Sequence, residues 1–312
     1  MGLTIATYNV KDLFDSVDEP SELHLDRKLD VLAGVIRTVD ADVLALQEVS
    51  SEAVLDRLRE RLPHAGSQLR YDTRIVGSAD ARGIRCALLS RLPVRASKVH
   101  TAEKLDFPRF RETDPAPFGA RIPLRRGIVH AEVDGGPFGT VHVLVLHFKS
   151  VRPVPLRAAS GAPLEPETAR ERAEGELRTM VWRASEALFV RGIVDDLFAQ
   201  HPGHSIVVTG DFNDVPGSTT LRIVSGDGRA SSSDDAEVTL HSAADAIETE
   251  RFSVLHRGRH LEIDHMLTSA GLRARVASAR FFNGDLRDHG LLAEGEVPTP
   301  DSDHAPLVVR FQ

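Results

Sequence analysis

The sequence has a single cysteine and no apolar run of membrane-spanning length. Cys86 is the only thiol among 312 residues, which excludes an internal disulfide and fits a reducing compartment. Its place in the apolar segment GIRCALLSR predicts a small core residue. No apolar run approaches the ~20 residues that a transmembrane helix needs. The start, MGLTIATYNV, lacks the basic and apolar regions of a signal peptide. We therefore expect a cytoplasmic protein.

An excess of positive charge is also missing. The chain has 38 Lys and Arg against 46 Asp and Glu, a formal net charge of −8. A protein that coats nucleic acid needs a basic face, so the charge argues against that class but not against an enzyme that holds one phosphodiester locally. The sequence contains no Gly-x-Ser-x-Gly elbow, P-loop or dinucleotide-binding glycine loop, and no Cys/His cluster typical of structural zinc.

What the sequence does contain is a series of apolar runs of strand length. The eight clearest are LTIATYNV, DVLALQEV, IRCALLS, GIVHAEV, TVHVLVLHF, SIVVTGDF, LEIDHMLTS and APLVVRF. Helical periodicity separates several of them, over 21–40 (with Ser21 or Asp26 as possible caps), 50–62 and 166–200.

The segment 166–200 predicts one long helix or two, because Gly175 and Gly192 weaken it locally. We expect its buried apolar stripe to consist of Leu177, Val181, Ala184, Leu188 and Val194.

Runs of strands with helices in a few blocks favour an α/β or α+β architecture, in which two β-sheets pack face to face with helices outside. The segments 152–167 and 225–237 are rich in loop-forming residues and are predicted to be loops. Neither reads as a linker, because apolar strands stand on both sides. We predict a single domain over residues 1–312.

Polar side chains follow several of the predicted strands. In GDFND, Asp211 and Asn213 share one side of the strand, while Phe212 points to the other side, into the core. A carboxylate there can take a proton from water or bind a hard cation, and a carboxamide can hold a phosphoryl oxygen. A simple turn explains the same letters equally well.

Other strand ends repeat this design. Glu48 precedes a helix start, so it can also serve that helix's N-terminus. Asp264 lies inside an apolar strand, and a buried carboxylate needs a partner. Each signal alone is weak, but the combined set is typical of metal-assisted phosphoester hydrolysis. The full set is Asn9, Glu48, His147, Asp211, Asn213, Asp264, Asp303 and His304.

The ordered segments TYNV, LQEV, LHFKS, GDFND, IDH and SDHAP, spread over residues 5–311, resemble the endonuclease/exonuclease/phosphatase (DNase I-like) superfamily. The resemblance implies a four-layer α/β sandwich, with two mixed β-sheets face to face, helices on both outer faces and the active site at one edge.

The resemblance also implies a divalent cation, Mg²⁺ with Mn²⁺ as an alternative. Glu48 would be its main ligand, Asn9 would help to position the metal or the nucleophile, and Asp303 would lie near the metal.

For the reaction itself, the resemblance implies a division of roles. Asp211 would orient or deprotonate the attacking water, and Asn213 would bind the phosphate. His304 would contact the scissile phosphate as base or electrostatic stabiliser, with Asp264 fixing its tautomer. His147 would assist the leaving oxygen or clamp the phosphate. The resemblance leaves the identity of the general base open.

Further phosphate contacts are less well specified. Arg121 is a candidate, although a solvated surface arginine explains it equally well. Lys149 and Arg82 are others. His289 follows Asp288 as His304 follows Asp303, but without the Ala-Pro and terminal strand of the second pair. The basic stretch 98–127 carries Phe107, Phe110 and Phe118, which suits stacked bases, a lipid phosphate or a loop packed on the core.

These observations predict a metal-dependent phosphodiesterase. A nuclease that acts on nucleic acid is the first hypothesis. A phosphoinositide- or sphingomyelin-type lipid phosphohydrolase is the alternative, disfavoured because no apolar hairpin for membrane insertion is visible. A non-catalytic binding module on the same fold is the alternative from another class.

Overall fold

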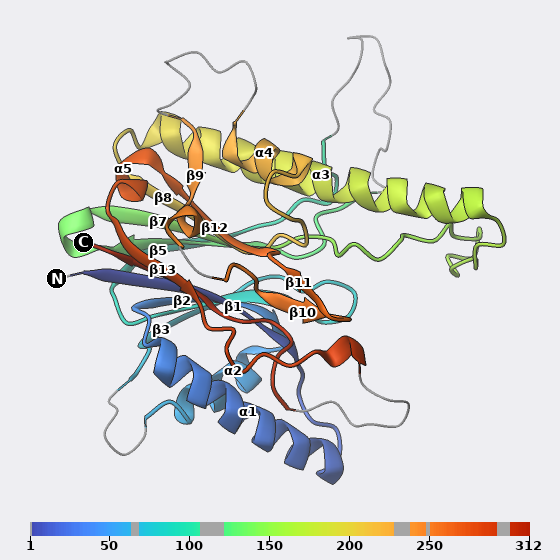
Figure 1. Cartoon of the computed structure of the whole chain (residues 1–312), viewed down its shortest axis with the longest axis horizontal. Coiled ribbons are helices and arrows are strands. Elements are labelled where there is room, and N and C mark those ends of the chain that lie inside the picture. Colours follow the sequence, from blue (N-terminus) through green and yellow to red (C-terminus); the bar gives the residue numbers. More distant parts are fainter. Residues whose placement is uncertain (1, 64–68, 107–121, 228–237, 248–249, 292–299) are drawn as a thin grey trace.

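The computed structural model describes residues 2–63, 69–106, 122–227, 238–247, 250–291 and 300–312. Two six-stranded sheets pack face to face. Helices α1 (Glu19–Val39) and α2 (Glu52–Glu60) cover the outer face of one sheet, and α3 (Ala169–Gln200) and α4 (Thr219–Ser225) cover the other (Figure 1). This arrangement confirms the predicted four-layer sandwich.

The first sheet has the strand order β13 (Val276–Phe281), β14 (Leu307–Phe311), β1 (Leu3–Leu13), β2 (Val43–Val49), β4 (Arg85–Ser90) and β3 (Thr73–Val76). Only β1 and β2 run parallel, and the other neighbours are antiparallel. The parallel pair therefore brings the carboxyl ends of β1 and β2 to one edge of the sheet.

The second sheet has the order β5 (Val94–His100), β6 (Ile128–Asp134), β7 (Thr140–His147), β8 (Ser205–Asp211), β12 (Asp264–Ser269) and β9 (Leu240–Ser242). Its parallel pair is β7 and β8, and β12 runs antiparallel to β8. A small hairpin, β10 (Val254–His256) and β11 (Arg259–Leu261), stands beside it, and α5 (Ala270–Arg273) follows β12.

Three apolar layers hold the sandwich together. The middle layer lies between the sheets and includes Ile5, Val43, Val143 and Val207. Two outer layers join each sheet to its helices. Strands that are covered on both faces need near-continuous apolar runs, which explains why the central strands were visible in the sequence. Cys86 is fully buried in the middle layer, and burial raises the pKa of its thiol to about 12, which confirms its predicted core role.

The helix starts are set by side-chain caps. Asp18, which the sequence analysis did not propose, caps α1, and Ser21 completes the capping box from inside the first turn. Ser51 caps α2 and Thr168 caps α3. The segment from Ala169 to Gln200 is one continuous helix.

The predicted apolar stripe of α3 was wrong in part. Leu177 and Leu188 are exposed, whereas Thr179, Arg183 and Glu186 are buried. The middle of α3, from Thr179 to Glu186, therefore buries polar side chains, because these side chains hydrogen-bond to backbone groups of the loops beneath them rather than packing on an apolar sheet face. Apolar periodicity cannot find such a face.

Edge strands account for most of the strands that the sequence analysis missed. β5 exposes most of its residues and β13 exposes half, so both lack a continuous apolar run. The predicted strand 261–269 is divided, since β11 ends at Leu261 and β12 begins at Asp264. In the parts of the chain that the structure describes, none of the helices has the length and apolar character needed to span a bilayer.

Candidate active site

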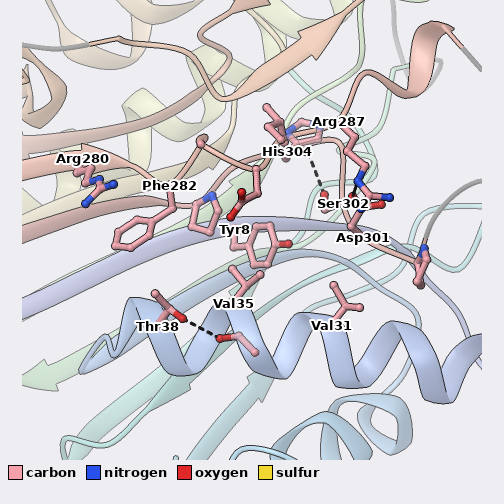
Figure 2. A pocket seen from close by; sticks show the side chains of 16 residues that line it. Tyr8, Val31, Val35, Thr38, Arg280, Phe282, Arg287, Asp301, Ser302 and His304 are labelled. Atoms are coloured by element: carbon pink, nitrogen blue, oxygen red, sulfur yellow. Dashed lines mark hydrogen bonds and ion pairs between the residues drawn. The ribbon is translucent and has the colours of Figure 1, made fainter.

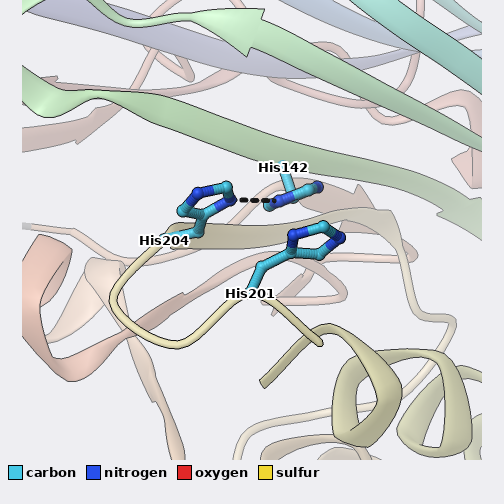
Figure 3. A group of neighbouring side chains, drawn as sticks. All are labelled: His142, His201 and His204. Atoms are coloured by element: carbon cyan, nitrogen blue, oxygen red, sulfur yellow. Dashed lines mark hydrogen bonds between the residues drawn. The ribbon is translucent and has the colours of Figure 1, made fainter. Parts of the chain in front are cut away.

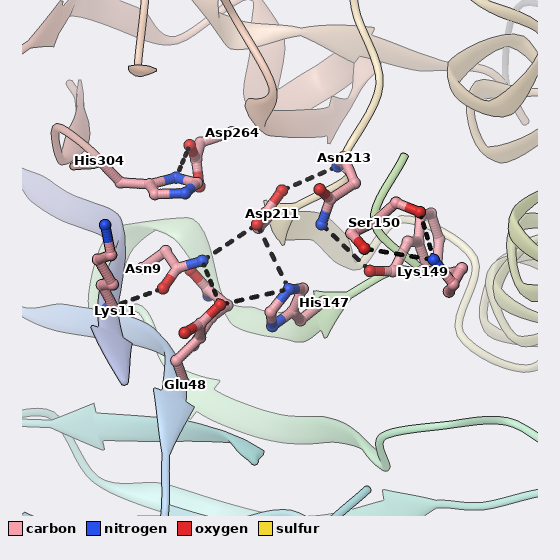
Figure 4. A network of polar contacts seen from close by, with 12 residues as sticks. Asn9, Lys11, Glu48, His147, Lys149, Ser150, Asp211, Asn213, Asp264 and His304 are labelled. Atoms are coloured by element: carbon pink, nitrogen blue, oxygen red, sulfur yellow. Dashed lines mark hydrogen bonds and ion pairs between the residues drawn. The ribbon is translucent and has the colours of Figure 1, made fainter. Parts of the chain in front are cut away.

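The predicted strand-end side chains meet at one edge of the sandwich. Asn9 and Glu48 come from the parallel pair β1 and β2 in one sheet. His147 and Asp211 end the parallel pair β7 and β8 in the other sheet, and Asp264 begins the antiparallel β12 opposite Asp211 (Figure 4). The topology thus gathers groups from both sheets into one cluster.

Gly210 permits the close approach that places Asp211. Its φ is 141°, and a Cβ at this position would lie 2.0 Å from the carbonyl oxygen of Leu146 on β7. No other residue fits there without moving the strand. The next turn is held by Asn213, whose backbone N–H donates to Asp211 Oδ1 at 2.8 Å and whose φ is 51°. Phe212 points into the core as predicted.

Glu48 lies on a β-bulge. The pairing of β2 with β4 shifts register between Gln47 and Val49, and Glu48 has a φ of 67°, which is strained for a residue with a side chain. Bulges beside active sites re-aim a side chain. Here the bulge aims the half-buried carboxylate at Asn9 and at the Asp12 backbone N–H, which donates to Glu48 Oε2 at 2.8 Å.

Asn9 connects the two carboxylates. Its buried Nδ2 donates to Asp211 Oδ2 at 3.0 Å and to Glu48 Oε1 at 3.4 Å, while its Oδ1 accepts from the Lys11 N–H at 2.9 Å. The amide therefore presents its NH₂ group to the carboxylates. In this orientation Asn9 positions the carboxylates and offers no oxygen to a cation beside them.

Asp211 is buried at the centre of the cluster. Burial, together with the nearby Asp264 charge, raises the pKa of Asp211 to about 7. Its Oδ2 lies 3.4 Å from His147 Nε2. Burial and the neighbouring Arg126 and His304 hold the pKa of His147 well below its ordinary value, so its imidazole is neutral. A carboxyl group that titrates near neutrality is suited to exchanging a proton with water.

His304 and Asp264 form the second half of the cluster. His304 Nδ1 donates to Asp264 Oδ2 at 2.7 Å. Burial alone would lower the pKa of His304, but the Asp264 charge and hydrogen bond, with Asp211 and Asp303, raise it to about 10. The imidazole is therefore a cation at neutral pH, and Asp264 fixes which of its nitrogens faces the open site.

Asp303 occupies a neighbouring ion-pair network. Its Oδ2 lies 2.6 Å from Lys11 Nζ, which also lies 2.8 Å from His289 Nδ1, and His289 in turn contacts Asp301 at 3.1 Å. Although burial opposes ionisation, His304 and Lys11 lower the pKa of Asp303. His289, set aside in the sequence analysis, thus belongs to the surroundings of Asp303.

The cluster suits a hard divalent cation. Carboxylate oxygens of Asp211 and Asp264 lie within 4.8 Å of one another, and the Glu48 carboxylate lies on the other side of Asn9 (Figure 4). Asp264 Oδ1 is buried and has no hydrogen-bond partner among the described residues. Carboxylate oxygens are the ligands that Mg²⁺ and Mn²⁺ prefer, so the donor set fits the predicted cofactor.

Helix α3 supports the loops that carry the cluster. Glu186 accepts the Lys149 N–H at 2.7 Å and the Arg125 N–H at 3.5 Å. Arg183 pairs with Asp214, with Nε 3.1 Å from Oδ2. Lys149, a predicted phosphate contact, directs its Nζ at the carbonyl oxygens of its own loop, including that of Ser150 at 2.7 Å. Its ammonium is therefore used to hold the loop.

Sequence reasoning missed Arg126 and Asp80, which lie behind His147. Arg126 is buried, donates to the carbonyl oxygens of His147 and Phe148, and lies 3.1 Å from Asp80 Oδ2. Nothing in the local sequence distinguishes this arginine from the basic residues around it. Arg82 remains exposed, with its backbone N–H donating to Asp80.

The remaining candidates lie outside the described residues. These are Arg121, Phe107, Phe110 and Phe118.

A cavity of about 640 Å³ opens beside His304 (Figure 2). It lies between α1 and the segment around β13, and its lining includes Tyr8, Phe282, Arg280 and Arg287. Glu48 and Asp211 do not line the cavity. The cavity therefore lies next to His304, on the side away from these two carboxylates.

The sequence matches the model of the endonuclease/exonuclease/phosphatase family over residues 6–304. The chain belongs to this family. No curated protein is similar enough in sequence to be matched.

Solved structures of family members share its fold. Truncated Caenorhabditis elegans TDP2 is similar with a TM-score of 0.57 and 18% identity, over 99% of this chain and 97% of that one. An AP endonuclease from Archaeoglobus fulgidus gives 0.55 and 16%, over 99% of each chain. A variant of the Neisseria 3′ phosphatase NExo, bound to a product DNA hairpin, gives 0.56 and 17%, over 99% of each. At these identities the likeness establishes the fold, which agrees with the predicted DNase I-like sandwich.

Proposed function

We propose that this family member is a divalent-metal-dependent phosphodiesterase that cleaves a nucleic acid. The observation that carries the proposal is the grouping of an imidazolium, His304, with the carboxylates of Glu48 and Asp211 at one edge of the two sheets. A phosphodiester carries negative charge that grows on the leaving oxygen during hydrolysis. Positive groups fixed in advance around that charge lower the barrier.

We assign the cation to Glu48, with Mg²⁺ first and Mn²⁺ as the alternative. When bound, the ion would neutralise charge on the phosphate oxygens. Asn9 holds the Glu48 carboxylate in place through its amide, so we assign it a positioning role. A metal role for Asp303 requires its carboxylate to leave Lys11, since the two now form a 2.6 Å ion pair.

The protonation states favour Asp211 as the group that takes the proton from water. The pKa of Asp211, about 7, leaves a usable carboxylate at neutral pH, whereas the pKa of His304, about 10, leaves its imidazole without a free basic nitrogen. His304 then donates to a phosphate oxygen, with Asp264 compensating its charge. Asn213 is assigned to the phosphate, and neutral His147 to the leaving oxygen.

Nucleic acid is the favoured substrate class for two reasons. The AP endonuclease from Archaeoglobus and the DNA-bound 3′ phosphatase from Neisseria use the same fold. The cavity beside His304 also carries Arg280 and Arg287, cations suited to further phosphates of a polymer.

The test is a substrate panel of supercoiled plasmid, abasic duplex, single-stranded RNA, inositol phosphates and sphingomyelin, with Mg²⁺ or Mn²⁺. We expect plasmid nicking that His304→Gln and Asp211→Asn each reduce by ~10²–10³. His24→Ala, at an exposed helix position, is the control and keeps full activity. Turnover of a lipid or inositol phosphate with inert plasmid would reassign the substrate. If the protein is folded but turns over none of these esters, the remaining hypothesis is a non-catalytic binding module.

A further inference from the structure

A second cluster of metal-ligating side chains lies far from the catalytic edge. It consists of His142, His201 and His204, whose ligand nitrogens all lie within 4.8 Å of one another (Figure 3). His142 stands near the start of β7, whereas His147 ends it, so the two sites are about 17 Å apart along the strand at ~3.3 Å per residue.

Three separate elements supply these imidazoles. His201 is the C-cap of α3, and His204 directly precedes β8. The short turn between them lies over β7, where His142 is fully buried while the other two are half-buried. No zinc-type spacing is visible in the sequence, because only the fold brings His142 close to the other two residues.

The three rings face one another closely. His142 Nε2 lies 2.9 Å from His204 Nδ1, and the ring centroids of all three pairs are 5.0 to 5.1 Å apart. A direct N–H···N contact places two ring nitrogens side by side. A zinc–nitrogen bond of ~2.0–2.1 Å needs nitrogens slightly further apart than this contact, which small side-chain rotations provide.

A further imidazole orients the buried member. His130 Nε2 lies 3.0 Å from His142 Nδ1, and His130 Nδ1 lies 3.3 Å from His100 Nε2. His130 therefore contacts Nδ1 of His142 and leaves Nε2 of His142 facing the cluster. In metal sites, a hydrogen bond to the ring nitrogen that does not bind the metal usually orients the histidine ligand.

The surroundings of His142 favour the binding of a metal cation by a neutral imidazole. Glu132 stands opposite His142 in the β6–β7 register and adds negative charge. Each ring nitrogen of His142 lies within 3.0 Å of another imidazole nitrogen, and such N–H···N contacts need one partner nitrogen without a proton. Metal binding requires a neutral imidazole.

We propose that His142, His201 and His204 form a binding site for one divalent transition-metal ion of the zinc type. Three imidazoles with no carboxylate among them select Zn²⁺, Ni²⁺, Cu²⁺ or Co²⁺ over Mg²⁺, so the site differs in chemistry from the oxygen-rich catalytic edge. The half-exposed rings leave the remaining coordination position to solvent. The ion would fasten the turn between α3 and β8 to the face of β7.

The binding test uses the full chain, stripped with a chelator and titrated calorimetrically with Zn²⁺. The titration is done with the Glu48→Gln variant, called the background protein, because this change weakens metal binding at the catalytic edge. We expect one Zn²⁺ per chain at this site, and a Co²⁺ absorption spectrum typical of nitrogen ligands. His201→Ala and His204→Ala should each weaken binding by more than the ~10–100-fold typical of changes in supporting residues.

Folding is controlled separately, because thermal unfolding without metal should be nearly unchanged in both variants at these half-exposed positions. Zn²⁺ should raise the unfolding temperature of the background protein and of His24→Ala, but not of the two variants. The same Zn²⁺ stoichiometry and affinity in His201→Ala and His204→Ala would overturn the proposal, as would a background protein that binds no Zn²⁺. The outcome does not depend on whether any phosphoester is cleaved.

Discussion

The side-chain amide of Asn9 donates a hydrogen bond to Asp211, with Nδ2 3.0 Å from Oδ2, and this contact joins β1 of one sheet to the end of β8 in the other. It is a direct polar link between the sheets, whereas the middle of the sandwich is apolar. A hydrogen bond donated to a carboxylate favours its charged form, so we expect this contact to lower the pKa of the buried Asp211.

Replacing Asn9 by Leu removes this donor while roughly keeping the volume of the side chain. We expect turnover to fall ~10–100-fold and the acid limb of the pH–rate profile to move to higher pH, because Asp211 loses a hydrogen bond that favours its charged form. The measurement is plasmid nicking between pH 5.5 and 9. Thr7→Val removes a buried polar pair two residues earlier and should leave the acid limb in place, and the same shift in both variants would contradict the assignment.

The His304–Asp264 pair predicts a pH-dependent stability. The pKa of His304 rises from 6.5 to about 10 on folding, so the native state holds this proton more tightly than the unfolded chain. Its stabilising contribution is therefore complete below pH 6.5 and is lost as the pH rises towards 10. Urea unfolding in EDTA should show this decline in the parent protein and a flatter profile in Asp264→Asn. Parallel profiles would show that the pair does not hold the proton.

Two glycines should respond to alanine in opposite directions. Gly210→Ala places a Cβ 2.0 Å from the Leu146 carbonyl oxygen at a φ of 141° and should destabilise by at least about 2 kcal/mol. Gly192 is exposed within α3 with no atom near its Cβ position, so Gly192→Ala should stabilise by about 0.5–1 kcal/mol. Chemical denaturation measures both, and a tolerated Gly210→Ala would refute the close approach of β7 and β8.

Glu186 should be required for the loop that follows β7. Glu186→Ala leaves the N–H groups of Lys149 and Arg125 without their acceptor and should cost about 2–4 kcal/mol. Glu186→Gln keeps one acceptor oxygen for the shorter bond and should lose less. An equal loss in both variants would mean that the charge, and not the hydrogen bond to Lys149, supports the loop. The measurement is the free energy of unfolding of each variant.

The sequence was most informative where burial is complete on both faces of a strand. Runs such as 140–148 and 205–212 are β7 and β8, and their polar ends indicated which edge carries the chemistry. The polar stripe of α3 was not predictable, because Arg183 and Glu186 resemble surface residues until the loops beneath them are known.

The backbone conformation around the site could not be predicted from the sequence either. The bulge that turns Glu48 inward depends on the pairing of β2 with β4, a contact between distant segments. The pairing of Arg126 with Asp80 and the grouping of His142 with His201 are of the same kind, since each depends on tertiary structure. The individual roles of the site residues stay predictions until the variants are measured.

The pairing of the first and last strands of the structure affects when the site can form during synthesis. Leu3 pairs with Phe311 in adjacent strands, and His304 reaches the cluster from the segment just before β14. A chain emerging from the ribosome would therefore carry Asn9, Glu48 and Asp211 well before the imidazole joins them. If His304 has the role proposed above, hydrolysis would begin only once the last strand has docked, and partly synthesised chains would be inactive.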